Sequence, residues 1–565
     1  MTLARHSYLI LYAIFALSCA RQTAPTGGPK DSIPPTLISS QPQSNELNFK
    51  GKTIQLAFSE HILLNNPRDQ IIITPDLGKP VNATARKNQV TITLEDELKP
   101  NTTYSINFRE AIQDITEKNP AAMLKLAFST GSYIDSLEID GNAFDPLSAK
   151  EIKDATLALY ENDTFNIFKH RATYVTKSDT KGFFKIENLK PGKYFLYGFE
   201  DKNKNLIVDS KTESYGFLRA PLQLEENITA LKIPLVRLDS RPLKLTSSRP
   251  SGTYFNIKAT KSLSHYQITT TEEETIISSF GEDLANIRVY NTFEDKDSVS
   301  IHLTAIDSIS NAIDTTLYVK FLKRQVTPEA FEFKLDKFEV IGTKGILRGQ
   351  IQFNKPVLAV NFDSIFYRID SLQVIPINAQ NIRWDSLRNI LFLEKIFDKN
   401  LLPKETASTS TSEQRRSIAA SPIRTGSKTS NKNQFYIGNA AFVSIELDSS
   451  KRAVNNYTPT KLEDTGIILV EVQTQAPHFF VQLLSKDFQI LRSMANLRKF
   501  NFEDLKPGDY QLRLVIDENN DAKWDPGNFY LKRQPEEILF YKNEKGSASI
   551  NLKANWELGP LLIKH

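Results

Sequence analysis

The chain has 565 residues, of which 40% are hydrophobic and 24% charged, and its formal net charge is +4 at pH 7. At about 100 to 200 residues per domain, this length predicts three to five domains. A net charge this small for the length, without a long run of Lys and Arg, argues against a concentrated nucleic-acid-binding face. A single cysteine, Cys19, excludes an internal disulfide, a cysteine-rich zinc site and an iron–sulfur cluster.

The N-terminus has the pattern of a secretory signal peptide. A basic start precedes an apolar stretch from Tyr8 to Leu17, and the stretch ends in A-L-S-C at Cys19. This ending resembles a bacterial lipobox, which implies that residues 1–18 are removed and that Cys19 carries acyl chains such as palmitate. The alternative is a chance cysteine in an ordinary signal. No other stretch approaches the roughly 18 apolar residues that span a bilayer, so lipid alone would hold the mature chain.

Residues 19–32 are polar and rich in glycine and proline, which predicts a flexible tether. Fully extended, the residues after Cys19 reach at most roughly 45 Å, enough to hold a domain clear of lipid head groups. Ala20 follows the cysteine where aspartate would retain a lipoprotein at the inner membrane, so the resemblance implies passage to the outer membrane. A lipid anchor permits either the periplasmic or the cell-surface face.

From Ile33 onward the chain reads as strands. Stretches of five to seven residues alternate apolar and polar side chains between Pro, Gly, Asn or Asp, for example Thr53 to Ser59 and Ser300 to Ile306. Few stretches longer than ten residues keep a helical period. The sequence therefore predicts an all-β chain of tandem β-sandwich domains.

Residues 33–131 carry the landmarks IQLAFSEHI, LKPNTTYSINF and LAFSTG. This unit resembles the S-layer type of bacterial Ig-like domain, which implies a sandwich fold in an envelope protein. Its acidic residues Glu60, Asp114 and Glu117 are either a metal-ligand set or polar residues at the ends of loops.

An internal repeat flanks the middle of the chain. Phe184 to Asp209 aligns without a gap with Phe500 to Asp525, and eleven of 26 positions are identical at a constant offset of 316. Both copies contain F-x-x-x-x-L-K-P-G-x-Y, a strand, a tight turn and a strand. The pattern resembles transthyretin-like or carboxypeptidase-regulatory-like sandwiches, which implies noncatalytic binding or spacing modules at residues 132–237 and 449–565.

Each copy continues as D-x-N-x-[ND]-x-x-x-D, with oxygen ligands at positions 1, 3, 5 and 9 of a candidate calcium loop. Position 6 is not glycine and position 12 is not glutamate, so the alternative is a hairpin tip held by Asx turns. The candidate calcium ligands are Asp201, Asn203, Asn205, Asp209, Asp517, Asn519, Asp521 and Asp525.

Between the repeats we expect two more domains. Residues 238–327 contain further alternating strands and form a β domain. Residues 328–448 return to the rhythm of the first unit and resemble a divergent Ig-like domain. Residues 404–433 interrupt it with Ser, Thr, Lys and Arg, which predicts a disordered insertion that either stays in solvent or contacts anionic head groups.

No catalytic motif stands out. The seven histidines never cluster, and H-E-x-x-H, G-x-S-x-G, G-x-G-x-x-G and Walker patterns are absent from the sequence. We therefore expect no enzyme. Trp384, Trp524 and Trp556 form either a sugar platform or parts of cores.

Asp followed by Ser or Thr and then a small or aliphatic residue recurs along the chain. The triplet is similar to the O-glycan acceptor of exported Bacteroidota proteins, and the alternative is plain turn chemistry. The candidate O-glycosylation residues are Ser32, Ser136, Ser298, Ser308, Thr315, Ser364, Ser371 and Ser386.

The resemblances together imply a noncatalytic, lipid-anchored outer-membrane protein of the Bacteroidota kind. Its expected role is to scaffold or bind other envelope proteins, including a membrane barrel or the barrel-assembly machinery. A surface carbohydrate-binding protein and a calcium-stabilised adhesin are the alternatives. Apart from structural calcium we expect no cofactor, and we expect no nucleic-acid partner.

Overall fold

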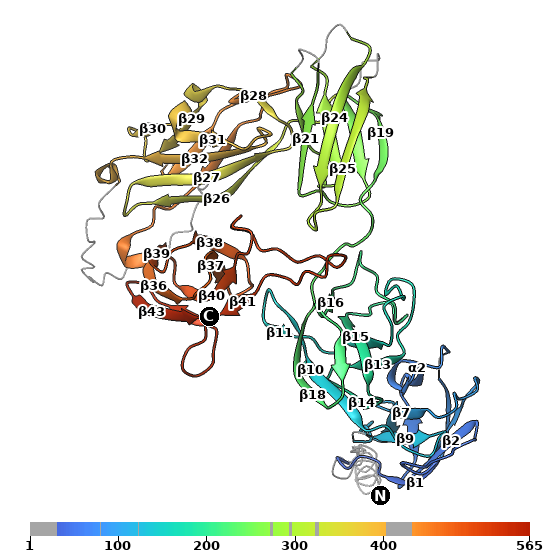
Figure 1. The fold of residues 1–565 in the computed structure, drawn as a ribbon. Helices are drawn as coiled ribbons and strands as arrows, with labels where there is room; N and C mark the ends of the chain where they lie inside the picture. Colours follow the sequence, from blue (N-terminus) through green and yellow to red (C-terminus); the bar gives the residue numbers. More distant parts are fainter. Residues whose placement is uncertain are drawn as a thin grey trace, which may run out of the picture.

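The computed structural model describes residues 31–79, 81–122, 124–271, 275–292, 296–321, 327–402 and 432–565. These residues form β-sandwiches in series, which confirms the predicted all-β class (Figure 1). Cys19, the signal peptide, the tether up to position 30 and all but the last two residues of the predicted insertion lie outside the described residues.

The N-terminal sandwich, residues 37–129, has sheets of order β1-β2-β6-β5, β4-β7-β9 and β3-β8. Alternation sets its faces: in β2 (Thr53–Phe58), Ile54 and Phe58 are buried whereas Gln55 is exposed. The other elements are β1 (Leu37–Gln41), β3 (Ile62–Leu64), α2 (Pro67–Gln70), β4 (Ile72–Thr74), β5 (Asn82–Arg86), β6 (Gln89–Thr93), β7 (Thr103–Asn107), β8 (Ile112–Asp114) and β9 (Lys125–Ser129).

The first repeat, residues 132–237, packs one sheet of order β11-β10-β14, with β18 parallel to β10, against another of order β13-β12-β15-β16, with β17 on β15. Its strands are β10 (Leu137–Asp145), β11 (Lys150–Glu151), β12 (Thr156–Tyr160), β13 (Tyr174–Lys177), β14 (Phe183–Leu189), β15 (Gly192–Phe199), β16 (Tyr215–Phe217), β17 (Leu222–Leu224) and β18 (Ile228–Pro234).

The β12-containing sheet of the first repeat is buried on both faces. Leu157 and Leu159 belong to the core between the two sheets, whereas Ala158 and Tyr160 belong to a separate aromatic-rich cluster. Because successive side chains of a strand point to opposite faces, this second cluster covers the outer face of the sheet. We call it the outer face of the first repeat.

The second repeat, residues 466–565, has the same strand pairing, except that its described sheets hold no counterpart of β11. One sheet has the order β39-β36-β43, with β36 and β43 parallel, and the other has the order β38-β37-β40-β41, with β42 on β40. Its elements are β36 (Gly466–Gln473), β37 (Phe479–Ser485), β38 (Ile490–Ala495), β39 (Lys499–Leu505), β40 (Gly508–Ile516), β41 (Ile538–Phe540), β42 (Ile550–Leu552) and β43 (Glu557–Lys564).

The shared L-K-P-G-x-Y motif closes the turn between two strands in both repeats. The Tyr194 hydroxyl donates to the Lys190 carbonyl at 3.0 Å, and the Tyr510 hydroxyl donates to the Lys506 carbonyl at 2.5 Å. Each tyrosine ring is buried in the core between the sheets. The motif is therefore a turn that its own tyrosine braces.

The middle sandwich, residues 243–321, packs sheets of order β19-β20-β23-β22 and β21-β24-β25. Its strands are β19 (Leu245–Ser251), β20 (Tyr254–Ala259), β21 (His265–Thr269), β22 (Ser278–Phe280), β23 (Asn286–Tyr290), β24 (Val299–Ile306) and β25 (Ala312–Val319).

The fourth sandwich, residues 331–457, has sheets of order β26-β27-β32-β31, β30-β29-β33-β35 and β28-β34. Its strands and short 3-10 helices are β26 (Phe333–Ile341), β27 (Ile346–Phe353), β28 (Val357–Val360), η1 (Phe362–Ser364), β29 (Ile365–Arg368), β30 (Val374–Pro376), η2 (Ala379–Asn381), β31 (Ile382–Trp384), β32 (Ile390–Ile396), η3 (Lys399–Leu401), β33 (Gln434–Ile437), β34 (Phe442–Ser444) and β35 (Ala453–Asn456).

The predicted boundary at residue 448 is corrected by β35. This strand pairs with β33 in register from Gln434 opposite Asn456 to Ile437 opposite Ala453. Tyr457 also packs against the core of the fourth sandwich. The fourth sandwich therefore continues past 448, and η4 (Leu462–Asp464) leads into the second repeat.

Ion pairs join neighbouring sandwiches, and one of them recurs at the same place in both repeats. Lys344 in the fourth sandwich pairs with Glu503 of the second repeat at 2.5 Å. The aligned residue of the first repeat, Glu187, pairs with Lys125 of the N-terminal sandwich. Each repeat thus receives a lysine from the sandwich that precedes it.

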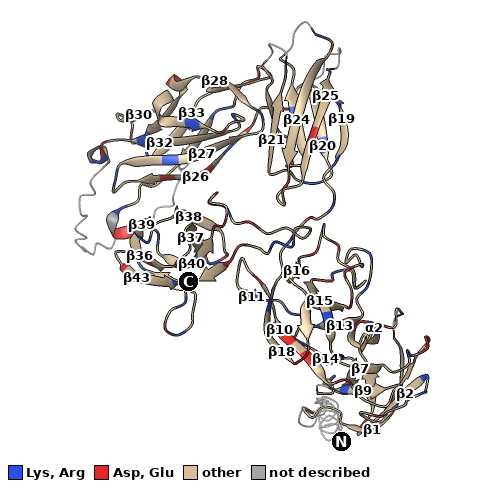
Figure 2. Cartoon of the chain, in the orientation of Figure 1, with Lys and Arg blue, Asp and Glu red and all other residues tan. Residues whose placement is uncertain are grey.

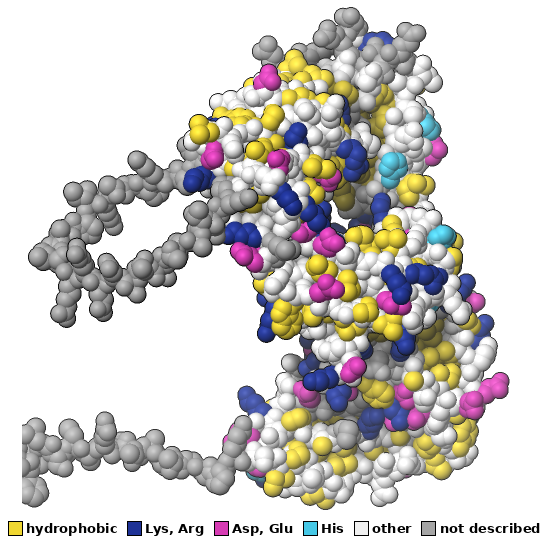
Figure 3. Space-filling model, turned by 90° about the vertical axis from the view of Figure 1, so that its left-hand side faces the viewer, with side chains coloured by type: hydrophobic (Ala, Val, Ile, Leu, Met, Phe, Trp, Pro, Cys, Tyr) yellow, Lys and Arg dark blue, Asp and Glu magenta, His cyan; other side chains and the backbone are white. Residues whose placement is uncertain are grey.

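Charges of both signs are dispersed over the molecule. Lys and Arg lie among Asp and Glu on all the sandwiches (Figure 2), and apolar and charged side chains intermix on the face turned to the viewer in Figure 3. This distribution agrees with the low net charge of +4.

Candidate functional site

The predicted lipidation site, Cys19, lies outside the described residues. Where the description begins, the Asp31 carbonyl accepts a hydrogen bond from Asn119 Nδ2 at 3.0 Å. The tether therefore ends against the N-terminal sandwich. Within the described ranges no helix is both long and apolar enough to cross a membrane.

The first candidate calcium loop is held by its own Asx turns. The Asp201 carboxylate accepts from the backbone N–H groups of Asn205 at 3.0 Å and Leu206 at 3.1 Å. Asn203 Oδ1 also accepts from Asn205, and Asn205 Oδ1 accepts from Ile207 at 2.7 Å. These side-chain oxygens thus satisfy backbone donors of the loop itself.

The second loop repeats these bonds. The Asp517 carboxylate accepts from the N–H groups of Asp521 at 3.1 Å and Ala522 at 2.9 Å, and Asn519 Oδ1 accepts from Asp521 at 3.1 Å. Ala522 has φ +58°, and the aligned Leu206 has φ +61°. Both loops therefore take the left-handed turn for which a calcium loop normally uses glycine.

A buried glutamate that the sequence analysis missed closes each loop. Glu213 is 0% exposed and accepts from the N–H groups of Lys202 at 3.0 Å and Asp209 at 2.8 Å. Glu536 does the same for Glu518 and for Asp525, each at 2.8 Å. Burial raises the pKa of both Glu213 and Glu536, although the backbone hydrogen bonds act in the opposite direction.

The carboxylates of the described residues are not gathered for metal binding. No group of three or more His, Cys, Asp or Glu in the described ranges is placed to hold a metal ion. In the N-terminal sandwich, Asp114 instead accepts from the backbone N–H groups of Glu117, Lys118 and Asn119. The contacts favour the loop-end interpretation of this set and the Asx-turn interpretation of the repeat loops, and the calcium site stays a prediction.

The three tryptophans lie in different places. Trp384 packs against the core of the fourth sandwich. Trp524 packs against the outer face of the first repeat, and its Nε1–H donates to the Glu536 carbonyl at 3.0 Å. Trp556 is 44% exposed, beneath the Lys553 ammonium. The structure brings no two of them together as a sugar platform.

The candidate O-glycosylation residues lie at the surface or partly so, and both interpretations of the triplet remain open. In several triplets the aspartate makes an Asx turn: Asp307 Oδ1 accepts from the N–H of Ile309 at 2.9 Å, and Asp370 Oδ1 from that of Leu372 at 2.8 Å. The modification stays a prediction. Thr315 and Ser364 are half-buried, and the exposed candidates are Ser32, Ser136, Ser298, Ser308, Ser371 and Ser386.

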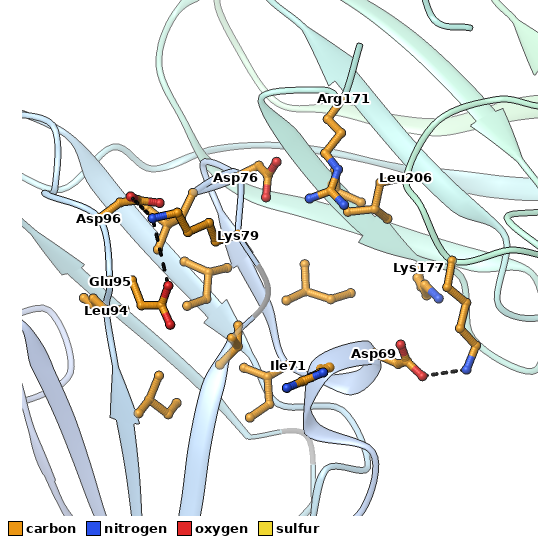
Figure 4. Close-up of a pocket in the computed structure, with 18 of the residues that line it drawn as sticks. Asp69, Ile71, Asp76, Lys79, Leu94, Glu95, Asp96, Arg171, Lys177 and Leu206 are labelled. Atoms are coloured by element: carbon orange, nitrogen blue, oxygen red, sulfur yellow. Dashed lines mark hydrogen bonds and ion pairs between the residues drawn. The ribbon is translucent and has the colours of Figure 1, made fainter. Parts of the chain in front are cut away.

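A cavity of about 240 Å³ lies between the N-terminal sandwich and the first repeat (Figure 4). Apolar side chains from both sides line it, among them Ile71, Leu94, Val175 and Leu206. Arg171 of the first repeat spans the junction beside it: its guanidinium donates to the Gly78 carbonyl of the N-terminal sandwich at 3.4 Å, and its Nε donates to the Asn205 carbonyl of the first loop at 3.1 Å. The first repeat loop therefore forms one wall of this cavity.

Charged side chains surround the cavity and largely pair with one another. Lys79 pairs with Asp96 at 2.9 Å, and Lys204 of the first repeat pairs with Asp69 of the N-terminal sandwich at 2.5 Å. Lys177 also lines the cavity, and burial lowers its pKa. The cavity therefore combines apolar side chains with charged groups, a lining that suits the binding of a ligand.

One family model matches the sequence. Residues 31–130 match the bacterial Ig-like domain, which agrees with the resemblance of residues 33–131. The match covers the N-terminal sandwich, and this part of the chain is therefore a bacterial Ig-like domain. No curated protein matches the sequence.

Solved structures show only loose likeness. A streptococcal ancillary pilin is 13% identical over 44% of this chain and 82% of its own, with a TM-score of 0.15. The N-terminal part of the bacterial S-layer protein SbsC is 10% identical over 36% and 44%, with a TM-score of 0.13. SGBP-B of a Bacteroides ovatus mixed-linkage glucan utilization locus, in complex with a mixed-linkage heptasaccharide, is 9% identical over 66% and 85%, with a TM-score of 0.15. Superpositions this loose carry no argument about this chain.

Proposed function

Starting from the bacterial Ig-like domain at residues 31–130, we propose that this chain is a noncatalytic, lipid-anchored envelope protein of the outer membrane. Cys19 carries the lipid, and the sandwiches that follow present their faces and loops to other envelope proteins. A membrane barrel or its assembly machinery is the partner class that the proposal names.

The observation that carries the proposal is the tie between successive sandwiches. An ion pair of Asp69 with Lys204 joins the N-terminal sandwich to the first repeat, and one of Lys344 with Glu503 joins the fourth sandwich to the second repeat, each at 2.5 Å. Sandwiches tied in this way form a spaced array of surfaces, which is what a scaffold needs. The ion-paired surroundings of the cavity support a binding role in the same sense.

Membrane fractionation tests the anchor. Cys19→Ala removes the acceptor for the acyl chains, so the variant is expected in the soluble envelope fraction, whereas the wild type is expected in the outer-membrane fraction. Ser18→Ala is the matched control, because it changes the neighbouring residue and leaves the cysteine. Unchanged membrane retention of Cys19→Ala would rule out the anchor.

Affinity purification tests the scaffold role. The tagged wild type, extracted from the outer membrane in detergent, is expected to co-purify with a defined envelope protein. Cys19→Ala lacks the membrane anchor and is expected to co-purify with less of that protein. Recovery of the chain alone after mild crosslinking would contradict the role.

Carbohydrate binding is the weaker alternative, because the three tryptophans lie in separate places. Titration calorimetry with envelope and dietary glycans separates the two functions, since saturable binding is expected only of a glycan receptor. A calcium-stabilised adhesin requires in addition that a chelator lower the melting temperature.

A further inference from the structure

The two repeats differ in the segment that follows the Asx loop. Asp209 and Glu213 are four positions apart, whereas Asp525 and Glu536 are eleven apart, although the two glutamates make equivalent hydrogen bonds. The second repeat therefore has seven residues here that the first repeat does not need. We call residues 525–536 the strap.

The strap is a preformed hairpin. The backbones of Asn528 and Arg533 pair in both directions, at 2.9 and 3.0 Å, and Arg533 forms an ion pair with Asp525 at 2.8 Å. Gly527 has φ +84°, and a Cβ there would lie 2.5 Å from the Arg533 carbonyl oxygen. A segment held in its bound shape loses little conformational entropy on docking.

The hairpin carries an aromatic ring into the outer face of the first repeat. The ring centroid of Phe529 lies 5.2 Å from that of Phe168, 5.5 Å from that of Phe217 and 5.9 Å from that of Tyr215, all edge to face. Figure 1 shows the segment reaching from the C-terminal sandwich towards β16. Without it, these aromatic side chains would be more exposed to water.

A lysine three positions later completes the contact. The Lys532 ammonium lies 4.2 Å from the ring centroid of Phe529 and 5.3 Å from that of Tyr197, and it donates to the Tyr197 hydroxyl at 3.2 Å. The Gln534 side chain donates to the Phe217 carbonyl at 2.6 Å. The segment Phe529 to Lys532 thus contacts the aromatic side chains of the outer face of the first repeat with both a ring and a cation.

The contact is reciprocal. Arg513 of the second repeat aligns with Tyr197 of the first, and it is 5% exposed. Its guanidinium donates to the Leu147 carbonyl in the β10–β11 turn of the first repeat at 2.8 Å, and the nearby Lys150 ammonium lies 5.0 Å from the ring centroid of Phe488 in the second repeat. Each repeat therefore receives a loop of the other at the same aligned position.

We propose that the two repeats clasp each other, each through a different loop, and that the strap closes the chain into a ring. The outer face of the first repeat is then an interaction surface whose occupant is the strap of the same chain. Lys532 and Tyr197 are 335 positions apart in sequence, and their contact closes a ring of chain. The middle and fourth sandwiches lie between these positions in the sequence and form the rest of the ring. This inference does not depend on the proposed envelope function.

Small-angle X-ray scattering of the full chain with Cys19→Ala, which needs no detergent, tests the closure. Phe529→Ala combined with Lys532→Ala is expected to increase the radius of gyration and the maximum dimension, because the ring opens. Leu531→Ala is the matched control, since Leu531 lies in the same turn and is 69% exposed. Identical scattering of the double variant and the control would overturn the proposal.

A second variant guards against misfolding. Deletion of residues 527–533 gives the second repeat the same four-position spacing that Asp209 and Glu213 have in the first repeat. The first repeat folds with this short connection, so we expect the shortened second repeat to fold as well. We expect an unchanged circular dichroism spectrum, the same expansion, and faster hydrogen exchange at β15 and β16. A compact deletion variant would overturn the closure. A third outcome would overturn the proposal that the strap binds its own chain. If the wild type forms a dimer that dissociates on dilution, and the deletion variant forms no dimer, the strap binds the first repeat of a second copy.

Discussion

Asp114 organises a whole turn of the Ig-like domain with one carboxylate. It is 0% exposed and accepts from the backbone N–H groups of Glu117 at 2.7 Å, Lys118 at 2.9 Å and Asn119 at 3.1 Å. Burial alone would raise its pKa, but the hydrogen bonds outweigh burial and lower the pKa below the ordinary 3.8.

This lowered pKa predicts a pH-dependent contribution to stability. A carboxyl whose pKa is lower in the folded than in the unfolded chain stabilises the fold above the unfolded pKa, and the contribution is lost as the pH falls through the folded pKa. Asp114→Asn is therefore expected to melt several degrees below the wild type at pH 7, and the difference should shrink below about pH 4. Thermal melts from pH 2 to pH 7 measure it, with the exposed Asp163→Asn as the control. A difference that does not change with pH would contradict the assignment.

The loop carboxylates make a second prediction at this scale. Asp517 is 2% exposed and accepts from the N–H groups of Asp521 and Ala522, so Asp517→Ala leaves the Ala522 amide without its acceptor, whereas the Asp521 amide keeps Asn519 Oδ1. At about 1–3 kcal/mol for such a group, we expect unfolding of the second repeat to become easier by about 2 kcal/mol. Urea unfolding measures the loss, and Lys523→Ala, an exposed change in the same loop, is the control. If calcium instead holds the loop, EDTA will lower the melting temperature of the wild type, a shift that hydrogen bonds alone do not produce.

At the scale of elements, one buried lysine joins strands from both sides of the predicted insertion. Lys355 precedes β28, is 0% exposed, and pairs with Glu446 at 2.6 Å and Asp448 at 2.9 Å just after β34. Removal of one partner from a buried ion pair leaves an uncompensated charge, which typically costs about 3–5 kcal/mol. Lys355→Met should therefore lower the free energy of unfolding of the fourth sandwich by this amount, measured by urea unfolding. The exposed Lys451→Met should change it little, and an equal small effect of both would contradict the interpretation.

The strands and the repeat could be predicted from sequence, because alternation and the L-K-P-G-x-Y turn are local patterns. The buried glutamates that close the two loops could not be predicted in this way. Glu213 and Glu536 are 323 positions apart, whereas the aligned segment has an offset of 316, so the alignment does not pair them. The extra residues that shift the second glutamate belong to the strap. The strap binds through a contact between Phe529 and rings of the first repeat that are more than 300 positions away, and no local sequence pattern marks such a contact.

At the scale of the whole molecule, the fourth sandwich connects two separate parts of the chain. β29 comes before the predicted insertion, residues 404–433, and pairs with β33, which follows it. β28 likewise pairs with β34. A cut within residues 403–431, which lie outside the described residues, would therefore leave two chains joined by strand pairing as well as by the strap.

Limited proteolysis tests this arrangement together with the predicted disorder of the insertion. Trypsin is expected to cut first among the Lys and Arg residues of 404–433, because an exposed disordered segment enters a protease without prior unfolding. The two fragments should co-elute in gel filtration and separate only in denaturant, since several hydrogen-bonded ladders join them. The double change Phe529→Ala and Lys532→Ala should open the ring and yet leave the fragments associated, because β29 and β33 still pair. Separation of the fragments without denaturant would show that strand pairing across the cut is too weak to hold the fourth sandwich, and first cleavage elsewhere would show that the insertion is ordered.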